Sequence, residues 1–241
     1  MKIAVIGASG RMGQAMCAGV RAEDDMELVA ALDVDEDITS DTLGGAEVAI
    51  EFTQPDASLG NVLSLIEAGV RPVVGTTGWT EEAYEKVRDA LAAQPGLGAV
   101  IAPNFSLSAI LAMRFAEQAA PYFTSAEVIE THHPGKLDAP SGTAIATAEK
   151  IARARADMGD MPDATTRDIG SRGARVDGVP VHAMRLAGVT AREEIHFGNP
   201  GDQLIIRTDC TDRAAFFSGV ALAAREVMGR EGLIIGLDQL L

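Results

Sequence analysis

Cysteine is nearly absent from this chain of 241 residues. Its two thiols, Cys17 and Cys210, stand far apart in the sequence and form no CxxC motif. Lone thiols without a partner motif behave as small apolar side chains, so we expect both to be buried.

Long apolar runs are also missing. No run of about eighteen apolar residues occurs, which argues against a membrane-spanning helix. The first residues, MKIAVIGASG, lack the long apolar region and the small-residue cleavage site of a signal peptide. We therefore expect a cytoplasmic protein with no membrane partner.

Positive charge is scarce: 20 Lys and Arg stand against 35 Asp and Glu, for a formal net charge of −15. This balance argues against nucleic acid and acidic membranes as partners. An anionic ligand must then be attracted by local positive groups, which screening over a Debye length of about 8 Å allows.

Side chains that can exchange protons or bind an anion are concentrated in one stretch, residues 127–144, which reads EVIETHHPGKLDAPSGTA. It holds half of the four histidines, His132 and His133, together with Lys136. An apolar run predicts a strand that ends near His132, and Pro134-Gly135 predicts a turn. Ser141-Gly142-Thr143 precedes a predicted helix over 144–154, whose first N–H groups favour an anion.

Histidine exchanges protons near neutral pH, so this stretch predicts a general acid beside a carboxylate or phosphate site. Gly142 allows a ligand to approach the backbone, and Ser141 and Thr143 offer hydroxyl groups. One alternative is that the histidines only build a turn and that Ser141 only caps the helix. A metal site is a weaker alternative, because no HExxH motif or cysteine accompanies the pair.

A glycine-rich turn follows the first predicted strand, residues 2–6. It reads GASGRMG over Gly7, Ala8, Ser9, Gly10, Arg11, Met12 and Gly13 and resembles the dinucleotide-binding fingerprint. Asp33 ends the next strand, 27–32, where an acid can bind an adenosine ribose and repel a 2′-phosphate. Arg11 could still reach such a phosphate, which leaves NADH and NADPH both open, and Asp33 could simply begin an acidic loop.

Further strands over 48–52, 71–74 and 99–101 alternate with predicted helices over 56–68 and from Glu81, which Thr80 caps. This alternation predicts an α/β fold, a doubly wound parallel sheet of the Rossmann type, with ligands at the carboxyl ends of the strands. The loops at that edge contain Gly75, Thr76, Thr77, Ala102, Pro103, Asn104 and Phe105. Ordinary turns are the alternative for any one of these loops.

A helix over 106–120 leads into a second α+β domain. Its predicted strands, 127–132, 181–186, 193–197 and 204–208, suggest a mixed or antiparallel sheet. The connection over 155–180 is a lid, an oligomer arm or a mobile segment. We predict one domain over 1–106 and a second over 107–211. Residues 212–241, which contain an amphipathic helix over 212–228 and a short apolar run, are predicted to return to the first domain.

The glycine turn, GTTGW, APNFS and THHPGKLDAPSGTA together resemble the 4-hydroxy-tetrahydrodipicolinate reductase family, also called the dihydrodipicolinate reductase family, over essentially the whole chain. The resemblance implies a Rossmann domain, a substrate and oligomerisation domain, and a homotetramer. It also implies reduction of a cyclic dicarboxylate with NADH or NADPH in lysine and diaminopimelate biosynthesis.

Residue by residue, the resemblance implies proton-transfer roles for His132 and Lys136, and substrate contacts for His133, Gly142 and Thr143 with Ser141 close by. The dinucleotide would contact residues 7–12, 75–77 and 102–105, with its adenosine ribose at Asp33. No metal is implied. The chain departs from the pattern at Ser108 and at Ala191-Arg192-Glu193, where many members have a glycine and a Gly-Glu-His sequence.

The implied mechanism is loss of water from the ring, hydride transfer and protonation, with closure of the two domains. Three alternatives stay open: a nicotinamide oxidoreductase with another anionic substrate, a non-catalytic dinucleotide sensor, and a Schiff-base enzyme that uses Lys136.

Overall fold

The computed structural model describes residues 1–241. The chain divides into two compact units, one made of residues 1–106 and 213–241 and the other of residues 107–212. The second unit was expected to end at residue 211, and it ends one residue later, at 212. None of the helices combines the length and the apolar character that crossing a lipid bilayer requires.

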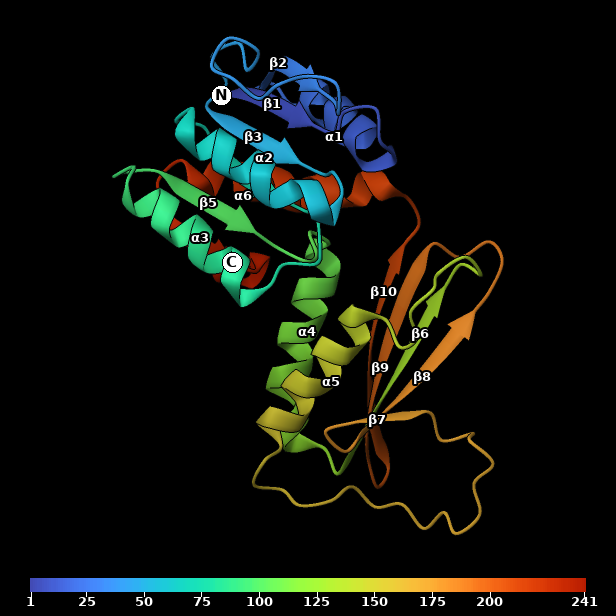
Figure 1. Ribbon diagram of the computed structural model, residues 1–241. Helices are drawn as coiled ribbons and strands as arrows, with labels where there is room; N and C mark the ends of the chain where they lie inside the picture. The colour runs from blue at the N-terminus through green and yellow to red at the C-terminus, as the bar shows by residue number, and fades with distance from the viewer. The chain divides into compact units, whose positions relative to one another are not determined.

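The first unit contains a six-stranded sheet in the order β11-β5-β4-β3-β1-β2 (Figure 1). Every neighbouring pair is parallel, which confirms the predicted doubly wound sheet. The strands are β1 (Lys2–Ile6), β2 (Glu27–Leu32), β3 (Val48–Glu51), β4 (Arg71–Val74), β5 (Gly98–Ile101) and β11 (Gly232–Ile235). Strands β3 and β5 are buried along their whole length, as expected for parallel strands that are covered on both faces.

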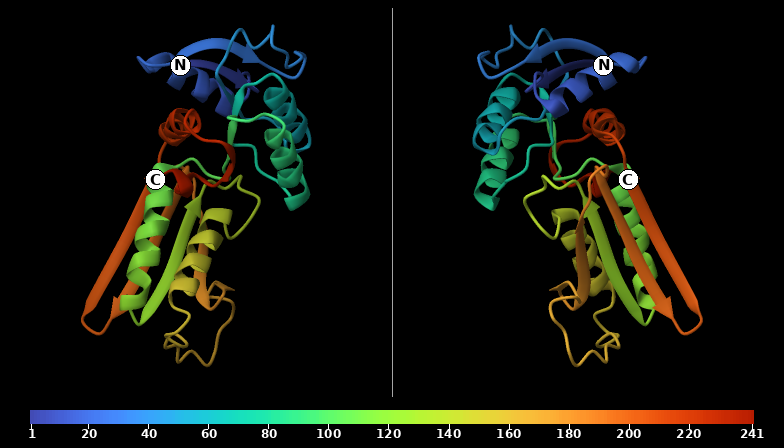
Figure 2. Two further views of the ribbon diagram at one scale, coloured as in Figure 1. Left: turned by 90° about the vertical axis from the view of Figure 1, so that its left-hand side faces the viewer. Right: turned by 90° about the vertical axis from the view of Figure 1, so that its right-hand side faces the viewer.

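Two helices cover each face of this sheet (Figures 1 and 2). Helices α2 (Pro55–Glu67) and α3 (Glu81–Ala92) lie on one face, and α1 (Arg11–Ala22) and α6 (Phe217–Val227) lie on the other. The side chain of Thr80 accepts a hydrogen bond from the Ala83 N–H, so the predicted cap of α3 is confirmed. The order of chain connections reverses at β1, between β2 and β3.

The C-terminal segment completes this unit. The helix expected over 212–228 starts only at Phe217, because a 3₁₀ turn (Arg213–Phe216) precedes it. The apolar run after it forms β11, which pairs with β5, and ends in a second 3₁₀ turn (Leu237–Leu240).

The second unit contains a five-stranded sheet in the order β10-β9-β6-β8-β7. The strands are β6 (Ser125–His132), β7 (Ala174–Val176), β8 (Val179–Arg185), β9 (Ala191–Asn199) and β10 (Asp202–Cys210). Only β6 and β8 run parallel, so the predicted mixed sheet is confirmed. Helices α4 (Leu107–Ala119) and α5 (Gly142–Ala154) cover one face, and a 3₁₀ turn (Ala120–Tyr122) follows α4 (Figure 2).

The connection after α5 contains no helix or strand until β7 begins at Ala174. Ion pairs tie it to its own unit: Arg172 contacts Glu127 on β6 at 2.5 Å, and Asp163 contacts Arg175 at 2.6 Å. Cys17 is buried as expected, whereas Cys210 is only half-buried and bonds to the carbonyl of Asp212.

Candidate active site

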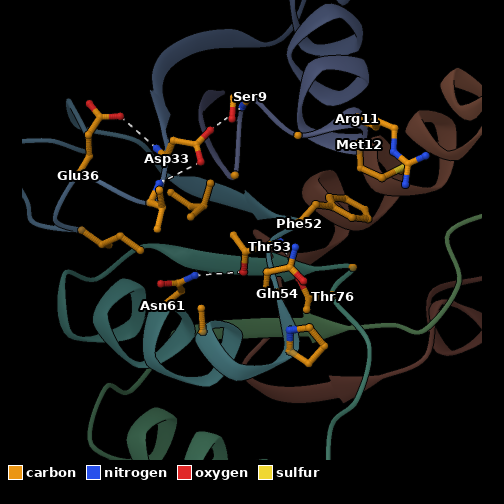
Figure 3. A pocket seen from close by; sticks show the side chains of 18 of the residues that line it. Ser9, Arg11, Met12, Asp33, Glu36, Phe52, Thr53, Gln54, Asn61 and Thr76 are labelled. Atoms are coloured by element: carbon orange, nitrogen blue, oxygen red, sulfur yellow. Dashed lines mark hydrogen bonds between the residues drawn. The ribbon is translucent and has the colours of Figure 1, made fainter.

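A cavity of about 770 Å³ lies in the first unit at the carboxyl ends of β1 to β4 (Figure 3). Ligands of doubly wound sheets bind at this edge, where the order of strands reverses. Several residues that the sequence predicts for cofactor binding line it together: Gly7, Ser9, Gly10, Arg11, Met12, Asp33, Gly75, Thr76 and Thr77. Residues that sequence reasoning did not select line it too, among them Val34, Glu36, Ile38, Phe52, Thr53, Gln54, Pro55 and Asn61.

Two glycines of the first turn stand where no side chain fits. Gly7 has a φ of +80°, and a Cβ there would lie 2.3 Å from the carbonyl oxygen of Phe52. A Cβ on Gly13 would lie 2.0 Å from the carbonyl oxygen of Gly7, so only glycine lets α1 start this close to β1. Gly10, the N-cap of α1, provides no side-chain cap. The start of α1 is therefore a suitable place for a phosphate.

Asp33 lies at the end of β2 and faces this turn. Its Oδ2 accepts a hydrogen bond of 2.7 Å from the N–H of Ser9, and its Oδ1 accepts one of 2.9 Å from the N–H of Val34. These hydrogen bonds from Ser9, followed by the one from Val34, lower the pKa of Asp33. Asp33 is therefore a fixed negative charge on the cavity wall, beside Glu36 (Figure 3).

A buried carboxylate supports the opposite wall. Glu51, at the end of β3, is fully buried and accepts hydrogen bonds from four side chains. The donors are the hydroxyls of Thr53, of Ser58 at 2.9 Å and of Thr76 at 2.8 Å, and the amide of Asn61 at 3.4 Å. The Thr76 hydroxyl also accepts from the Thr53 N–H at 2.8 Å. The hydroxyl hydrogen of Thr76 points at Glu51, so it is not available to a ligand. A ligand that contacts Thr76, as the sequence predicts, would therefore meet its backbone.

Other predicted cofactor residues do not line the cavity. Ala8 and residues 102–105 lie outside its wall. Ala102 and Phe105 are buried, and the ring of Phe105 packs edge-on against Phe52, which does line the cavity, with centroids 6.1 Å apart. Asn104 accepts a hydrogen bond of 2.9 Å from the N–H of Ser106. In this structure, Phe105 supports the cavity through Phe52.

The predicted general acid, His132, ends β6 in the second unit. Its Nδ1 lies 2.6 Å from Oε2 of Glu130, which is fully buried. Arg185 on β8, the register partner of His132, donates to both oxygens of Glu130 at 2.8 and 3.0 Å. Burial alone would raise the pKa of Glu130, but the hydrogen bonds from Arg185 and His132 and their charges outweigh it and lower that pKa. The carboxylate accepts the Nδ1 hydrogen, so Nε2 is the ring atom that can exchange a proton.

Lys136 follows in a tight turn, in which its N–H bonds to the carbonyl of His133 at 3.1 Å. Its ammonium group is half-buried and contacts Asp138 at 2.8 Å. The hydrogen bond from Lys136 lowers the pKa of Asp138. Arg185 also donates to the Asp138 carbonyl at 2.6 Å, which links this turn to the His132 group. His133 is exposed.

The start of α5 lies next along the chain. Ser141 is the N-cap: its buried hydroxyl accepts a hydrogen bond of 3.2 Å from the Ala144 N–H. Its own N–H donates to Glu130 at 3.1 Å, so one carboxylate holds both His132 and the helix start. Gly142 is exposed, and a Cβ there would meet nothing within 4 Å. A ligand can therefore approach the backbone at this position.

A second buried carboxyl group lies beside Glu130. Glu193 on β9 is the register partner of Glu130 on β6 and is 6% exposed. Its Oε1 lies 2.7 Å from the Thr147 hydroxyl, and its Oε2 has no hydrogen-bond partner. Burial raises the pKa of Glu193 to about 7; the hydrogen bond with Thr147 opposes this rise and the charge of Glu130 adds to it.

Sequence reasoning missed Glu130, Arg185, Glu193 and Glu51. A signal existed for Glu130: side chains alternate along a strand, so Glu130 shares a face with Val128 and His132. Glu51 directly follows a buried apolar run, where an acid is unusual. Arg185 and Glu193 lie on separate strands, and only the pairing of those strands brings them to Glu130.

The parallel sheet with its glycine turn is the architecture of dinucleotide-binding enzymes, and the second unit carries an imidazole and an ammonium group. Two family models match the chain, the N-terminal part of dihydrodipicolinate reductase over residues 1–105 and its C-terminal part over residues 108–241. The chain belongs to the dihydrodipicolinate reductase family, an enzyme family of lysine and diaminopimelate biosynthesis. The resemblance seen in the sequence is thus confirmed.

The chain is similar to 4-hydroxy-tetrahydrodipicolinate reductases along its full length. The enzyme of Beutenbergia cavernae is 54% identical over 241 residues, which cover 99% of this chain and 97% of that protein. The enzyme of Nocardia farcinica is 52% identical over 244 residues, which cover 100% of this chain and 98% of that protein.

Solved structures agree. The dipicolinate-bound dihydrodipicolinate reductase of Paenisporosarcina sp. TG-14 is 34% identical, with a TM-score of 0.88 over 100% of this chain and 99% of that one. The scyllo-inositol dehydrogenase of Lactobacillus casei is 14% identical, with a TM-score of 0.61 over 100% of this chain and 92% of that one. The latter likeness shows the fold alone.

Proposed function

We propose that the protein reduces 4-hydroxy-tetrahydrodipicolinate to tetrahydrodipicolinate with NADH or NADPH, in lysine and diaminopimelate biosynthesis. One observation carries this proposal: Glu130 joins the proton-exchanging His132 and the start of α5 in one hydrogen-bonded group. A general acid is thereby fixed beside a place for a carboxylate. The relatives that match along the full length are named 4-hydroxy-tetrahydrodipicolinate reductases, which supports the proposal.

The first unit would hold the dinucleotide. A pyrophosphate would suit the glycine turn, where an added Cβ would clash, and the start of α1, which has no side-chain cap. A ribose would suit the acidic Asp33. Residues 7–12 and 75–77 would contact the cofactor directly, and 102–105 complete the predicted set, with Phe105 acting through Phe52. When bound, the reduced nicotinamide supplies the hydride.

The second unit would hold the substrate. Gly142 and Thr143 at the start of α5 would bind a carboxylate, with Ser141 fixing the helix start and His133 on the adjoining turn. The backbone N–H groups and the helix dipole favour an anion there. Dipicolinate, the ligand of the Paenisporosarcina enzyme, is a cyclic dicarboxylate of the kind this site would take.

His132 and Lys136 would transfer the protons. Glu130 holds the ring through Nδ1, so His132 Nε2 would give its proton to the leaving hydroxyl group or to the reduced ring. Lys136 would be a second donor, and its positive charge would offset the negative charge that develops on the substrate. Either group can donate a proton, His132 as an imidazolium and Lys136 as an ammonium group.

Hydride transfer requires the nicotinamide and the substrate to meet. We propose that the two units close on each other when both ligands bind. Small-angle scattering with dipicolinate, with NADH and with both would test this. An unchanged distance distribution in all three samples would contradict it.

The remaining proposals rest on the family. We propose a homotetramer in the cytoplasm, with no membrane or nucleic-acid partner and no metal. The sheet face that α4 and α5 leave uncovered carries Met184 and Ile205, which are 47% and 52% exposed and would be covered by a second copy. Light scattering coupled to gel filtration would give the mass of the assembly, and a monomer at micromolar concentration would contradict this proposal.

The decisive experiment is consumption of NADH and of NADPH by the purified protein with chemically generated 4-hydroxy-tetrahydrodipicolinate. We expect turnover with at least one dinucleotide. Tight NADH binding without turnover would favour a dinucleotide sensor, and turnover only with another carbonyl or imine would favour a different reductase. Covalent trapping of Lys136 by borohydride with substrate would favour a Schiff-base mechanism.

A further inference from the structure

Glu193 is the one buried carboxyl group in the second unit that the proposed mechanism does not use. It sits at the position where the chain departs from the family pattern, within Ala191-Arg192-Glu193. The hydrogen bonds around Glu193 do not account for a carboxyl group at this position. Glu130 is already satisfied by His132, Arg185 and Ser141, while Oε2 of Glu193 is buried without a partner.

The hydrogen bonds around Thr147 bear on the charge of Glu193. The Thr147 hydroxyl lies 3.0 Å from the carbonyl oxygen of Thr143 and 2.7 Å from Oε1 of Glu193. A hydroxyl group has one hydrogen, and a carbonyl can only accept. If the Thr147 hydroxyl donates its hydrogen to the Thr143 carbonyl, it can only accept in its contact with Glu193. The carboxyl group of Glu193 must then carry the hydrogen of that second bond. A protonated Glu193 therefore satisfies this chain of contacts in full.

No positively charged group pairs with Glu193 to favour its ionised form. On β6 its register partner is Glu130, and on β10 it is Thr208. Helix α5 contributes the hydroxyl of Thr147. Helix α4 contributes small apolar side chains such as Ala112 to the hydrophobic core of the second unit. Arg185 and the ring of His132 both bind Glu130 instead. A second buried negative charge here would be unpaired, which is costly.

We propose that Glu193 is a positioning residue that carries a proton in the active form, and thereby keeps the wall behind the start of α5 free of a second negative charge. This inference rests on the proposed function, because it assumes a dicarboxylate at Gly142 and Thr143. When Glu193 loses its proton, the new charge repels the substrate carboxylate and disturbs Glu130, which holds His132. Glu193 acts through Thr147 and Glu130 and does not touch the substrate.

The test compares the native protein with Glu193→Gln, which keeps the shape and cannot ionise. Calorimetry would measure dipicolinate binding between about pH 6 and pH 8.5, and a parallel assay would measure substrate KM and kcat. We expect equal affinities near pH 6, and above pH 8 a roughly three- to tenfold weaker binding by the native protein than by the variant. The KM should follow the same pattern, with a smaller change in kcat.

Glu194→Gln is the matched control, since Glu194 is the next residue, is partly exposed and pairs with Arg207. It should keep the native pH dependence. The same pH dependence in native protein and Glu193→Gln would overturn the inference, as would a Glu193→Gln variant that binds weakly at every pH. Dipicolinate binding needs no turnover, so absent NADH oxidation would contradict the proposed function while the binding data still decide the role of Glu193.

Discussion

Glu130 Oε2 and His132 Nδ1 lie 2.6 Å apart, two residues from each other on the same face of β6. This contact fixes the orientation of the imidazole and its tautomer, because a carboxylate can only accept the Nδ1 hydrogen. The two N–H groups of Arg185 hold the carboxylate in turn. His132 is thus the outer member of a buried, charged group, and its Nε2 is left for chemistry.

Removal of either proposed proton donor should abolish most of the turnover. We expect His132→Ala and Lys136→Ala each to lower kcat by about a hundredfold or more, the scale of a positioned acid. Affinity for NADH, measured by fluorescence titration, should stay near the native value, because both residues lie in the second unit. Lys150→Ala, at an ammonium group paired with Glu117, is the control and should keep native turnover. Native turnover in Lys136→Ala would refute its role.

A methyl group at the start of α5 should block the substrate without harming the fold. The Cβ of Gly142→Ala meets nothing within 4 Å in the protein, so the unfolding midpoint should not fall. A ligand against this backbone would be displaced, and we expect substrate KM to rise about tenfold or more. Gly60→Ala in α2, where a Cβ also meets nothing, is the matched control. An unchanged KM in Gly142→Ala would place the carboxylate elsewhere.

The acid at the end of β2 should discriminate between the two dinucleotides. Asp33 is a fixed negative charge on the cavity wall and would repel a 2′-phosphate. We expect Asp33→Ser to shift the ratio of kcat/KM values toward NADPH by about tenfold, a difference near 1.4 kcal/mol. Steady-state kinetics with both cofactors would measure it. The exposed Asp35→Ser should leave the ratio unchanged, and a similar shift there would point to general charge effects.

The buried carboxylate of the first unit should matter for stability and for the cofactor. In Glu51→Gln an amide group would face hydroxyl and amide donors, and such a mismatch costs about 1–3 kcal/mol of unfolding free energy. Because Thr53 and Thr76 line the cavity, NADH affinity should fall by about tenfold as well. Urea unfolding and NADH titration would measure the two effects. Exposed Glu47→Gln should show neither, and a stable Glu51→Gln with native affinity would contradict the prediction.

Glu193 should also make stability depend on pH. The pKa of Glu193 is raised to about 7 in the folded protein, so its contribution is fully present below the ordinary glutamate pKa and is lost as pH rises through about 7. Relative to Glu193→Gln, the native protein should lose about 2–3 kcal/mol of unfolding free energy between about pH 5 and pH 8. Urea unfolding at several pH values would test this. Parallel curves for the two proteins would show that Glu193 stays ionised.

Local patterns predicted most of the elements. The apolar run over 2–6, the glycine turn and the acid at 33 gave the first βαβ unit with strand ends that match the structure. Thr80 was correct as a cap because capping depends only on nearby residues. The helix expected from residue 212 was wrong in its start, since the 3₁₀ turn over 213–216 depends on packing that periodicity does not report.

By itself the sequence determined which groups are candidates for the chemistry: His132 and Lys136, the start of the helix at Gly142 and the glycine turn at Gly7. Each of these depends on residues within about one turn or one strand end, which short-range patterns specify. The tertiary structure alone decided that Glu130, Arg185 and Glu193 meet, because strand pairing brings together residues more than fifty positions apart. Burial then sets their charges, since the cost of a charge depends on the neighbours that folding supplies.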